Sequence, residues 1–443
     1  MSDENKVKVK IYTPDFEEEE NSSLKMEIAT FADGSRVQPR IKVEQHKKYV
    51  AWRDNASSKF TDYPTKLIEL YNSCPLHHAI IDMKAELIGG DGLKLKDENS
   101  PKAEQTLAFI EEMNFDGENL TDINKHLAFE QALFNMFSTQ LIFRKDWSYI
   151  QNVKYVGIAN LRIQAPNEKG EINGYYWAFD WSRFNQNKMV YIEKFNPKLA
   201  QDRSFRLKDI EKRIADNNAD IKDIKFYEEM ANIDNTQLYI WRQRKPEEYY
   251  YSLPEYVACI SDLEIDILAR IYAASSLSNG FDPSFMMTFL GNPSDKTTRD
   301  FAKKMIRNYK GARKAGMPIL NFVDSFEDKP QLEQLSNQNP MAQKYRIIND
   351  LTQQNILSGH RIPSASLVGI QTAGKLGDSN NLVQGQEAFY NNYIKPKQNI
   401  LEKYWNTIMK YNGLDEVVIA ETNVFNENKI ESQQNNISTE NKQ

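Results

Sequence analysis

The sequence of 443 residues is 40% hydrophobic and 27% charged, and its formal net charge is −6. This composition is that of an ordinary soluble protein, long enough for two or three cores or for one elongated subunit. The acidic balance argues against a protein that binds nucleic acid over its whole surface, although such a chain can touch DNA locally or let it pass without sticking.

The cysteine content and the hydropathy pattern limit the class of protein further. Cys74 and Cys259 are the only cysteines, and neither lies in a Cys-x-x-Cys pattern. A disulfide framework and a thiolate metal site are therefore excluded, and a reducing compartment is indicated. The first ten residues hold no apolar signal segment, and no uncharged apolar run approaches the ~20 residues of a membrane span. We expect a soluble protein made in a cytoplasm, with no membrane partner.

The first ordered part is predicted to be helical. The expected helices span residues 63–72, 75–88, 101–113 and 121–137. Ser73 is expected to cap the second of these helices, with Pro75 just inside it. The segment Gly89-Gly90-Asp91-Gly92 ends that helix, because glycine accepts the left-handed conformation at a helix C-terminus.

Between residues 140 and 241 the pattern changes to short aromatic and β-branched runs separated by Gly and Asn. Such runs are typical of strands. The expected strands span residues 141–143, 161–163, 175–179, 189–192 and 238–241. The charged stretch 200–230 is interpreted as a helical excursion. The sequence thus predicts an α+β fold that is mostly helical.

A strong amphipathic helix is predicted after Pro254, and Asn279-Gly280 ends it. A small β-α-β module follows, made of strands at 284–290 and 317–323 with a helix at 296–314 between them. A second strong helix is expected at 341–357.

After this helix comes a loop of small and polar residues at 364–381, which is unusual between two strong helices unless the loop has a function. A long amphipathic helix over 381–410 follows. Pro396 is expected to bend it, because proline lacks an N–H and collides with the carbonyl of Asn392.

Two groups of basic residues could meet a partner. Lys375 is the only full charge in the loop before Asp378, so it could exchange phosphate contacts with a duplex; it could equally be a solvated loop residue. The helix at 296–314 carries a basic stripe at helical spacing that could contact an acidic protein or DNA, or could be a solvated face. The stripe comprises Lys296, Arg299, Lys303, Arg307, Lys310 and Lys314.

Signatures of catalysis are weak. Asp262, Glu264 and Asp266 would share one side of a strand, as in a metal-dependent nuclease, but the surrounding stripe predicts a helix, on which Glu264 turns away. His77 and His78 point apart on a helix, and His46, His126 and His360 are isolated in the sequence. No phosphate-binding loop and no G-x-S-x-G nucleophile motif is present. We expect no enzyme activity, no cofactor and no metal.

Four segments, taken in order over roughly 350 residues, resemble the bacteriophage portal protein family. None is specific alone. Ile362 and Val368 replace more usual residues in one of them, and 200–230 has no counterpart. The segments are 71–93 with its N-S-C-P-L and G-D-G-L pieces, 251–280 ending in Asn-Gly, 361–369 (RIPSASLVG) and 389–396 (FYNNYIKP).

The resemblance implies a portal-type subunit of eight parts. In chain order these are a flexible N-terminal arm at 1–45, a wing at 46–254, stem helix 1 at 255–280, a clip at 281–338, stem helix 2 at 339–358, a tunnel loop at 359–381, a long kinked helix and terminal strand at 382–425, and a disordered tail at 426–443.

The resemblance also implies a function. Twelve copies would form a ring at one capsid vertex of a virion, dock the terminase large subunit during packaging, and later carry the adaptor and tail. Major capsid and scaffolding proteins would be further partners, and double-stranded DNA would pass through without sequence specificity. The DNA-facing residues would be Gln371, Thr372, Lys375 and Asn380. Asp262 and Asp266 would line the channel, and Lys303, Arg307, Lys310 and Lys314 would dock a partner.

The main alternative is a head-closure or minor capsid protein that oligomerises without a DNA channel. It predicts neither a module between the two strong helices nor a free loop after Gly369, and the sequence has both. A nuclease would instead be a compact monomer with metal-dependent activity.

Overall fold

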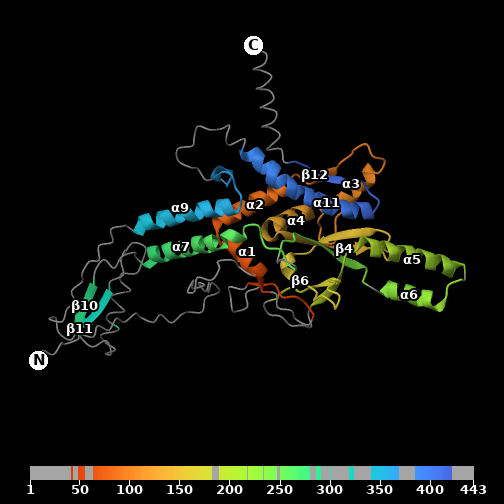
Figure 1. Cartoon of the computed structure of the whole chain (residues 1–443), viewed down its shortest axis with the longest axis horizontal. Helices are drawn as coiled ribbons and strands as arrows, with labels where there is room; N and C mark the ends of the chain where they lie inside the picture. The colour runs from red at the N-terminus through yellow and green to blue at the C-terminus, as the bar shows by residue number, and fades with distance from the viewer. Residues whose placement is uncertain are drawn as a thin grey trace, which may run out of the picture. The chain divides into compact units, whose positions relative to one another are not determined.

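The chain divides into two compact units, which are described separately below. Unit 1 holds residues 1–28 and 264–352, and unit 2 holds residues 29–263 and 353–443. The computed structural model, drawn in Figure 1, describes residues 41–42, 48–54, 63–181, 189–216, 218–232, 234–246, 250–279, 286–290, 300, 319–323, 341–368 and 385–421. The described fold is α+β and mostly helical, as the sequence predicted.

The N-terminal helices of unit 2 follow the predicted order. They are α1 (Tyr63–Ser73), α2 (Pro75–Gly89), α3 (Ala103–Glu111) and α4 (Leu120–Phe134). The predicted cap at Ser73 is wrong: Ser73 ends α1, and Cys74 is the N-cap of α2 without a side-chain hydrogen bond. Gly90, at φ 59°, ends α2 as expected.

Helix α4 is fixed at both ends by local hydrogen bonding. At its start, the Asn119 side chain accepts from the Asp122 N–H and the Asp122 side chain accepts from the Asn119 N–H, a capping box. At its end, Asn135 adopts the left-handed conformation at φ 56°. The helix therefore stops before Phe137, which the sequence had assigned to it and which lies in the next strand.

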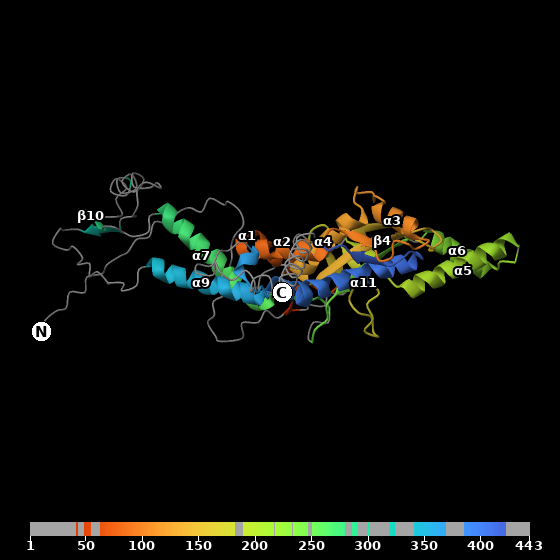
Figure 2. The same ribbon diagram turned by 90° about the horizontal axis from the view of Figure 1, so that it is seen from above.

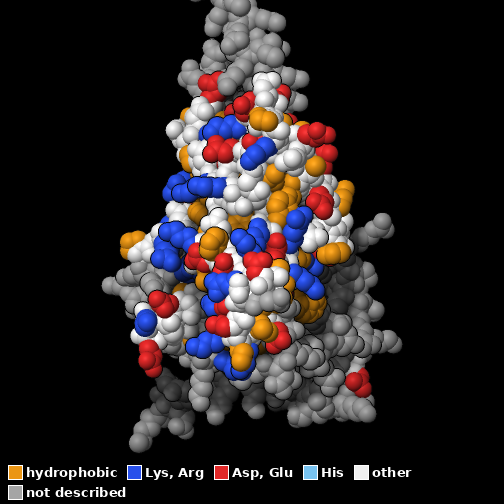
Figure 3. Space-filling model, turned by 90° about the vertical axis from the view of Figure 1, so that its right-hand side faces the viewer, with side chains coloured by type: hydrophobic (Ala, Val, Ile, Leu, Met, Phe, Trp, Pro, Cys, Tyr) orange, Lys and Arg blue, Asp and Glu red, His pale blue; other side chains and the backbone are white. Residues whose placement is uncertain are grey.

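A six-stranded sheet forms the centre of unit 2. Its strands are β4 (Met136–Phe143), β5 (Ile150–Tyr155), β6 (Leu161–Ile163), β7 (Gly174–Trp177), β8 (Val190–Lys194) and β9 (Thr236–Arg242), in the order β5-β4-β9-β8-β7-β6. Every pair is antiparallel except β8 with β9. A parallel pair needs a crossover connection, and this explains the predicted excursion at 200–230: it consists of α5 (Pro197–Ala215) and α6 (Ile221–Asn232). On the side where α5 and α6 lie, acidic and basic side chains are interspersed (Figure 3).

The C-terminal part of unit 2 packs on α2, α4 and the sheet. Helix α11 (Lys395–Tyr411) lies near α2 and α4 (Figures 1 and 2), and it is followed by β12 (Val417–Ile419), which pairs with β3 (Leu93–Leu95). Tyr404 stacks on Tyr239 with ring centroids 4.0 Å apart, and the indole N–H of Trp405 donates to Asn124 over 2.9 Å. These contacts join the helix to the core of the unit.

A π-helical turn, η6 (Tyr390–Ile394), precedes Pro396, where the sequence predicted a bend. The Lys395 N–H reaches back to the carbonyl of Tyr390, one residue farther than in an α-helix. Such a wider turn is a recognised way to fit an irregularity into a helix without ending it.

Unit 1 contains most of two long helices and a pair of strands. Helix α7 (Ile260–Asn279) and helix α9 (Met341–Gly359) each have one end in unit 2. Strands β10 (Met286–Leu290) and β11 (Ile319–Val323) pair in parallel, which agrees with the predicted β-α-β module. Of the helix expected at 296–314, only residue 300 is described, and it is helical. Within the described parts of the chain, we find no helix long and apolar enough to cross a bilayer.

Candidate functional site at the ends of two long helices

The C-terminal end of α9 has a defined cap. Arg361 adopts the left-handed conformation at φ 58°, and the Ile362 N–H donates to the Leu357 carbonyl over 2.9 Å. This hydrogen bond closes the last turn, and Pro363 follows and cannot continue the helix. The backbone conformation is therefore fixed where the chain leaves α9. The sequence predicts that the tunnel loop begins here.

The end of α9 rests directly on the 3-10 turn η3 (Val257–Cys259), which precedes α7. A Cβ atom added to Gly359 would lie 2.6 Å from the Sγ atom of Cys259, so only glycine allows this approach. One turn earlier, the Asn355 side chain donates to the Asp262 carboxylate over 2.8 Å. The predicted channel residue Asp262 thus joins the two helices within unit 2.

Asp266, the second predicted channel residue, lies in unit 1 and is only 3% exposed. Its carboxylate receives the Arg270 guanidinium at 2.9 and 3.4 Å, one turn along the same helix. In a single chain its charge is therefore neutralised, whereas Asp262 is half-buried and faces a neutral amide. Both lie on α7, so the predicted helix is confirmed and the strand geometry of the nuclease alternative is wrong.

A buried lysine contacts the end of α9. Lys84, on α2, is 2% exposed, and its Nζ donates to the backbone carbonyl of His360 over 2.9 Å. The same Nζ lies 3.4 Å from Nδ1 of His360 and 4.4 Å from the centre of the Tyr393 ring. The ammonium thus contacts a helix C-terminus and an aromatic face, both of which favour a cation.

The sequence prediction that His360 is isolated is wrong, because its Nε2 lies 2.9 Å from Nδ1 of His77. Burial and then the charge of Lys84 lower the pKa of both rings, that of His77 to about 3, so both are neutral at pH 7. When Lys84 is protonated, Nδ1 of His360 accepts from it, and the Nε2–H of His360 donates to His77.

Lys84, His77 and His360 form a buried cluster, and the carboxylate of Glu255, which precedes α7, acts on the charge of Lys84. It receives Nζ of Lys397 at 2.7 Å, and Lys397 also donates to Asn135. Burial acts to raise the pKa of Glu255, but Lys397 and the Tyr393 hydroxyl lower it below its ordinary value. Burial lowers the pKa of Lys84 to about 7, against the opposing field of Glu255. Glu255 is therefore paired with Lys397 and acts on Lys84 only through its electrostatic field.

Local sequence patterns did not lead us to this cluster, although one signal was present. Ile80, Lys84 and Ile88 follow one another at four-residue spacing on α2, and all three are buried. A lysine on the apolar stripe of a helix is seldom fully buried unless it is paired. Its partner His360 is 276 residues away, and no local pattern predicts that contact.

The remaining predicted site residues are not described by the structure. Outside its described ranges lie the loop residues Gln371, Thr372, Lys375 and Asn380 and the basic residues Lys303, Arg307, Lys310 and Lys314. No group of three or more His, Cys, Asp or Glu side chains that could hold a metal ion occurs among the described residues.

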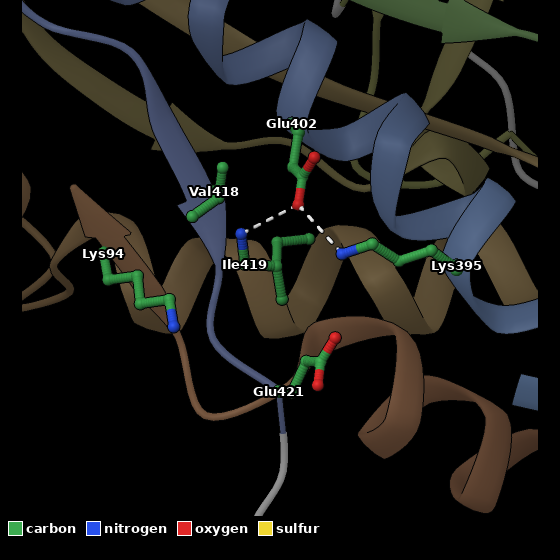
Figure 4. Close-up of a pocket in the computed structure, with 6 residues that line it drawn as sticks. All are labelled: Lys94, Lys395, Glu402, Val418, Ile419 and Glu421. Atoms are coloured by element: carbon green, nitrogen blue, oxygen red, sulfur yellow. Dashed lines mark hydrogen bonds and ion pairs between the residues drawn. The ribbon is translucent and has the colours of Figure 1, made fainter. Parts of the chain in front are cut away.

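A pocket of about 280 Å³ lies in unit 2, where α11 meets β12 (Figure 4). Its polar residues balance one another: the Glu402 carboxylate accepts from the Ile419 N–H over 3.0 Å and lies 3.7 Å from Nζ of Lys395. Lys94 and Glu421 add one charge of each sign. This pairing within the wall leaves little to select a charged ligand.

Comparison with known proteins gave no matching family model and no matching curated protein. Among solved structures, a chain of the virion of a native gene transfer agent (GTA) particle is 12% identical, with a TM-score of 0.48 over 84% of this chain and 89% of that chain. A chain from the neck of an empty GTA particle, computed with C6 symmetry, is 14% identical over 80% and 83%, with a TM-score of 0.48. A chain from the neck of a native GTA particle, computed with C12 symmetry, has the same identity and coverage and a TM-score of 0.47.

Proposed function

We propose that this chain is the subunit of a portal, a ring at one vertex of a phage-type capsid through which double-stranded DNA enters and leaves. The proposal rests on the four sequence segments that resemble the portal family and on the order of the parts in the structure. Along the chain, the parallel strands β10 and β11 lie between the two long helices α7 and α9. After α9 come residues 369–384, then the π turn η6 and α11.

The observation that best supports assembly into a ring is the exposure of apolar side chains on α7 and α9. Five aliphatic residues within unit 1 are each at least 42% exposed: Ile265, Ile271, Ile347, Ile348 and Leu351. Three of them recur at helical spacing on α9, so they form one apolar stripe. In a ring each subunit contacts its neighbours through two different surfaces, and such a contact would cover the stripe.

In this proposal the chain has a structural role and is not an enzyme. Gln371, Thr372, Lys375 and Asn380 would face DNA, where phosphate contacts fix no sequence register. Asp262 and Asp266 would lie on the stem. The basic residues Lys303, Arg307, Lys310 and Lys314 would dock the terminase large subunit or the head-tail adaptor, with the major capsid and scaffolding proteins as further partners.

Negative-stain electron microscopy of the purified full chain tests the proposal. We expect end-on views of closed rings of about twelve subunits with a central hole. If particles form only together with scaffolding or capsid protein, the ring should appear in that mixture. Monomers or dimers in both preparations would contradict the portal and favour the structural protein without a channel.

A further inference from the structure

We propose that Lys84 is a positioning residue: from α2 it holds both chain segments that flank residues 369–384, the end of α9 on one side and the π turn η6 on the other. The inference that a portal uses Lys84 in this way rests on the function proposed above. The positioning itself rests only on contacts within unit 2 and can be tested without any ring.

The geometry places one ammonium group between the two flanking segments. Its hydrogen bond of 2.9 Å goes to the backbone carbonyl of His360, at the point where α9 ends. Its cation–π contact goes to Tyr393, which follows residues 369–384 in the sequence. The hydrogen bond to the carbonyl fixes the backbone where α9 ends, and the contact with the ring holds the Tyr393 side chain of η6 against the same ammonium.

The surroundings of Lys84 fit a positioning role better than a stabilising one. A buried lysine costs free energy, and an apolar side chain of similar volume is often neutral or favourable in its place. The charged or titratable groups around it come from five segments. They are His77 from α2, Glu255 and Cys259 before α7, His360 and Arg361 after α9, Tyr393 from η6 and Lys397 from α11. With Glu255 already paired to Lys397, Lys84 has no carboxylate of its own, and its ammonium is held by the carbonyl and the ring.

Two variants separate positioning from bulk stability. Lys84→Met keeps the volume and removes the donor. Lys397→Met is the matched control, since Lys397 is also buried near Tyr393 but donates its described hydrogen bonds to Asn135 and Glu255. The measurement is amide hydrogen exchange at Arg361 and Ile362, whose N–H groups form the cap of α9, together with the thermal midpoint of each variant.

For Lys84→Met we expect exchange at these two amides to accelerate about tenfold or more, with a thermal midpoint equal to or above that of the wild type. For Lys397→Met we expect a lower midpoint and unchanged exchange at Arg361 and Ile362. Unchanged exchange in Lys84→Met would overturn the proposal. A lower midpoint with exchange accelerated uniformly across unit 2 would also overturn it, because that is what a merely structural residue produces.

Lys84→Gln provides the second test if the methionine variant does not fold. Its amide nitrogen is one atom closer to the backbone than Nζ, so it falls short of the His360 carbonyl while remaining polar. We expect accelerated exchange at Arg361 and Ile362, and wild-type exchange would contradict the proposal. Electron microscopy of the same sample reports the ring separately, so a wrong portal assignment and a wrong positioning residue give different results.

Discussion

Glu255 and Lys397, which are 142 residues apart in the sequence, form an ion pair of 2.7 Å whose side chains are only 15% and 9% exposed. The pair links the segment before α7 to α11. It also balances one of the two lysines that are buried in the described part of unit 2, Lys84 and Lys397.

The first prediction concerns this pair. Glu255→Gln leaves Lys397 buried without a counter-charge, and we expect the free energy of unfolding to fall by about 3 kcal/mol. Urea unfolding at pH 7 measures the change. The double variant Glu255→Gln with Lys397→Met should recover a large part of the loss, because the uncompensated charge is gone. An additive double variant would show that the pair does not act as a unit.

A second prediction follows from Glu130 on α4, which is 1% exposed and accepts from the Ile158 N–H at 2.7 Å and the Tyr155 hydroxyl at 3.0 Å. Burial raises the pKa of Glu130 to about 8, against these two hydrogen bonds. The folded state therefore holds a proton that the unfolded state loses above pH 4.5. Stability contributed by this proton is fully present below pH 4.5 and is lost as the pH rises towards 8.

Glu130→Gln removes this titration while keeping an acceptor oxygen. We expect it to stabilise the protein at pH 8 by on the order of 3 kcal/mol and to have little effect at pH 4.5. Chemical unfolding of both proteins at the two pH values measures the difference. Equal effects at both pH values would mean that Glu130 is charged in the fold.

The third prediction tests the contact between the end of α9 and the turn η3 before α7. Gly359→Ala places a methyl group 2.6 Å from Sγ and 2.7 Å from Cβ of Cys259, and we expect a loss of about 1–3 kcal/mol, despite the better helix propensity of alanine. Gly385→Ala is the matched control, since its Cβ would meet nothing within 4 Å. The control should be neutral or up to about 1 kcal/mol more stable. Thermal unfolding of both variants distinguishes the two results.

The helices and strands that were predicted correctly from the sequence are those whose conformation is determined by their own residues. Helix α7 has a continuous apolar stripe, and Gly90 ends α2 by its conformation. Strand β5 was missed because it is a polar edge strand, with Ile150 and Val153 as its only buried residues. Its Ile150 is held by the Asn412 side chain, which accepts from the N–H at 2.7 Å and donates to the carbonyl at 2.9 Å from 262 residues away.

The candidate site could be predicted only in part for the same reason. The helices that form it were found, because their periodicity is local. The cluster of Lys84, His77 and His360 was not found, because it depends on how α2 and the end of α9 pack together. Tertiary contacts of this kind give a residue its role without leaving a pattern near it in the sequence.

A fourth prediction tests the ring through the apolar stripe of α9. Leu351 is 56% exposed, so Leu351→Glu should leave the fold of the subunit unchanged within about 0.5 kcal/mol. If a neighbouring subunit covers the stripe, the buried charge should prevent closed rings. Mass photometry measures the oligomer, and Gln105→Glu, which adds the same charge to the exposed face of α3 in unit 2, is the control. Rings of normal size in Leu351→Glu would show that the stripe is not a subunit contact.

The last prediction concerns residues 371–379, which the sequence interprets as the part of the tunnel loop nearest DNA. Deleting them should leave ring formation intact, because the contacts that join α9, η6 and α2 lie outside the deletion. Packaging or retention of DNA should be impaired, since Gln371, Thr372 and Lys375 are removed. A packaging assay and electron microscopy of the same preparation measure the two effects, with Lys375→Gln as a milder variant that removes only the charge. Loss of the ring on deletion would show that this segment holds subunits together and does not face DNA.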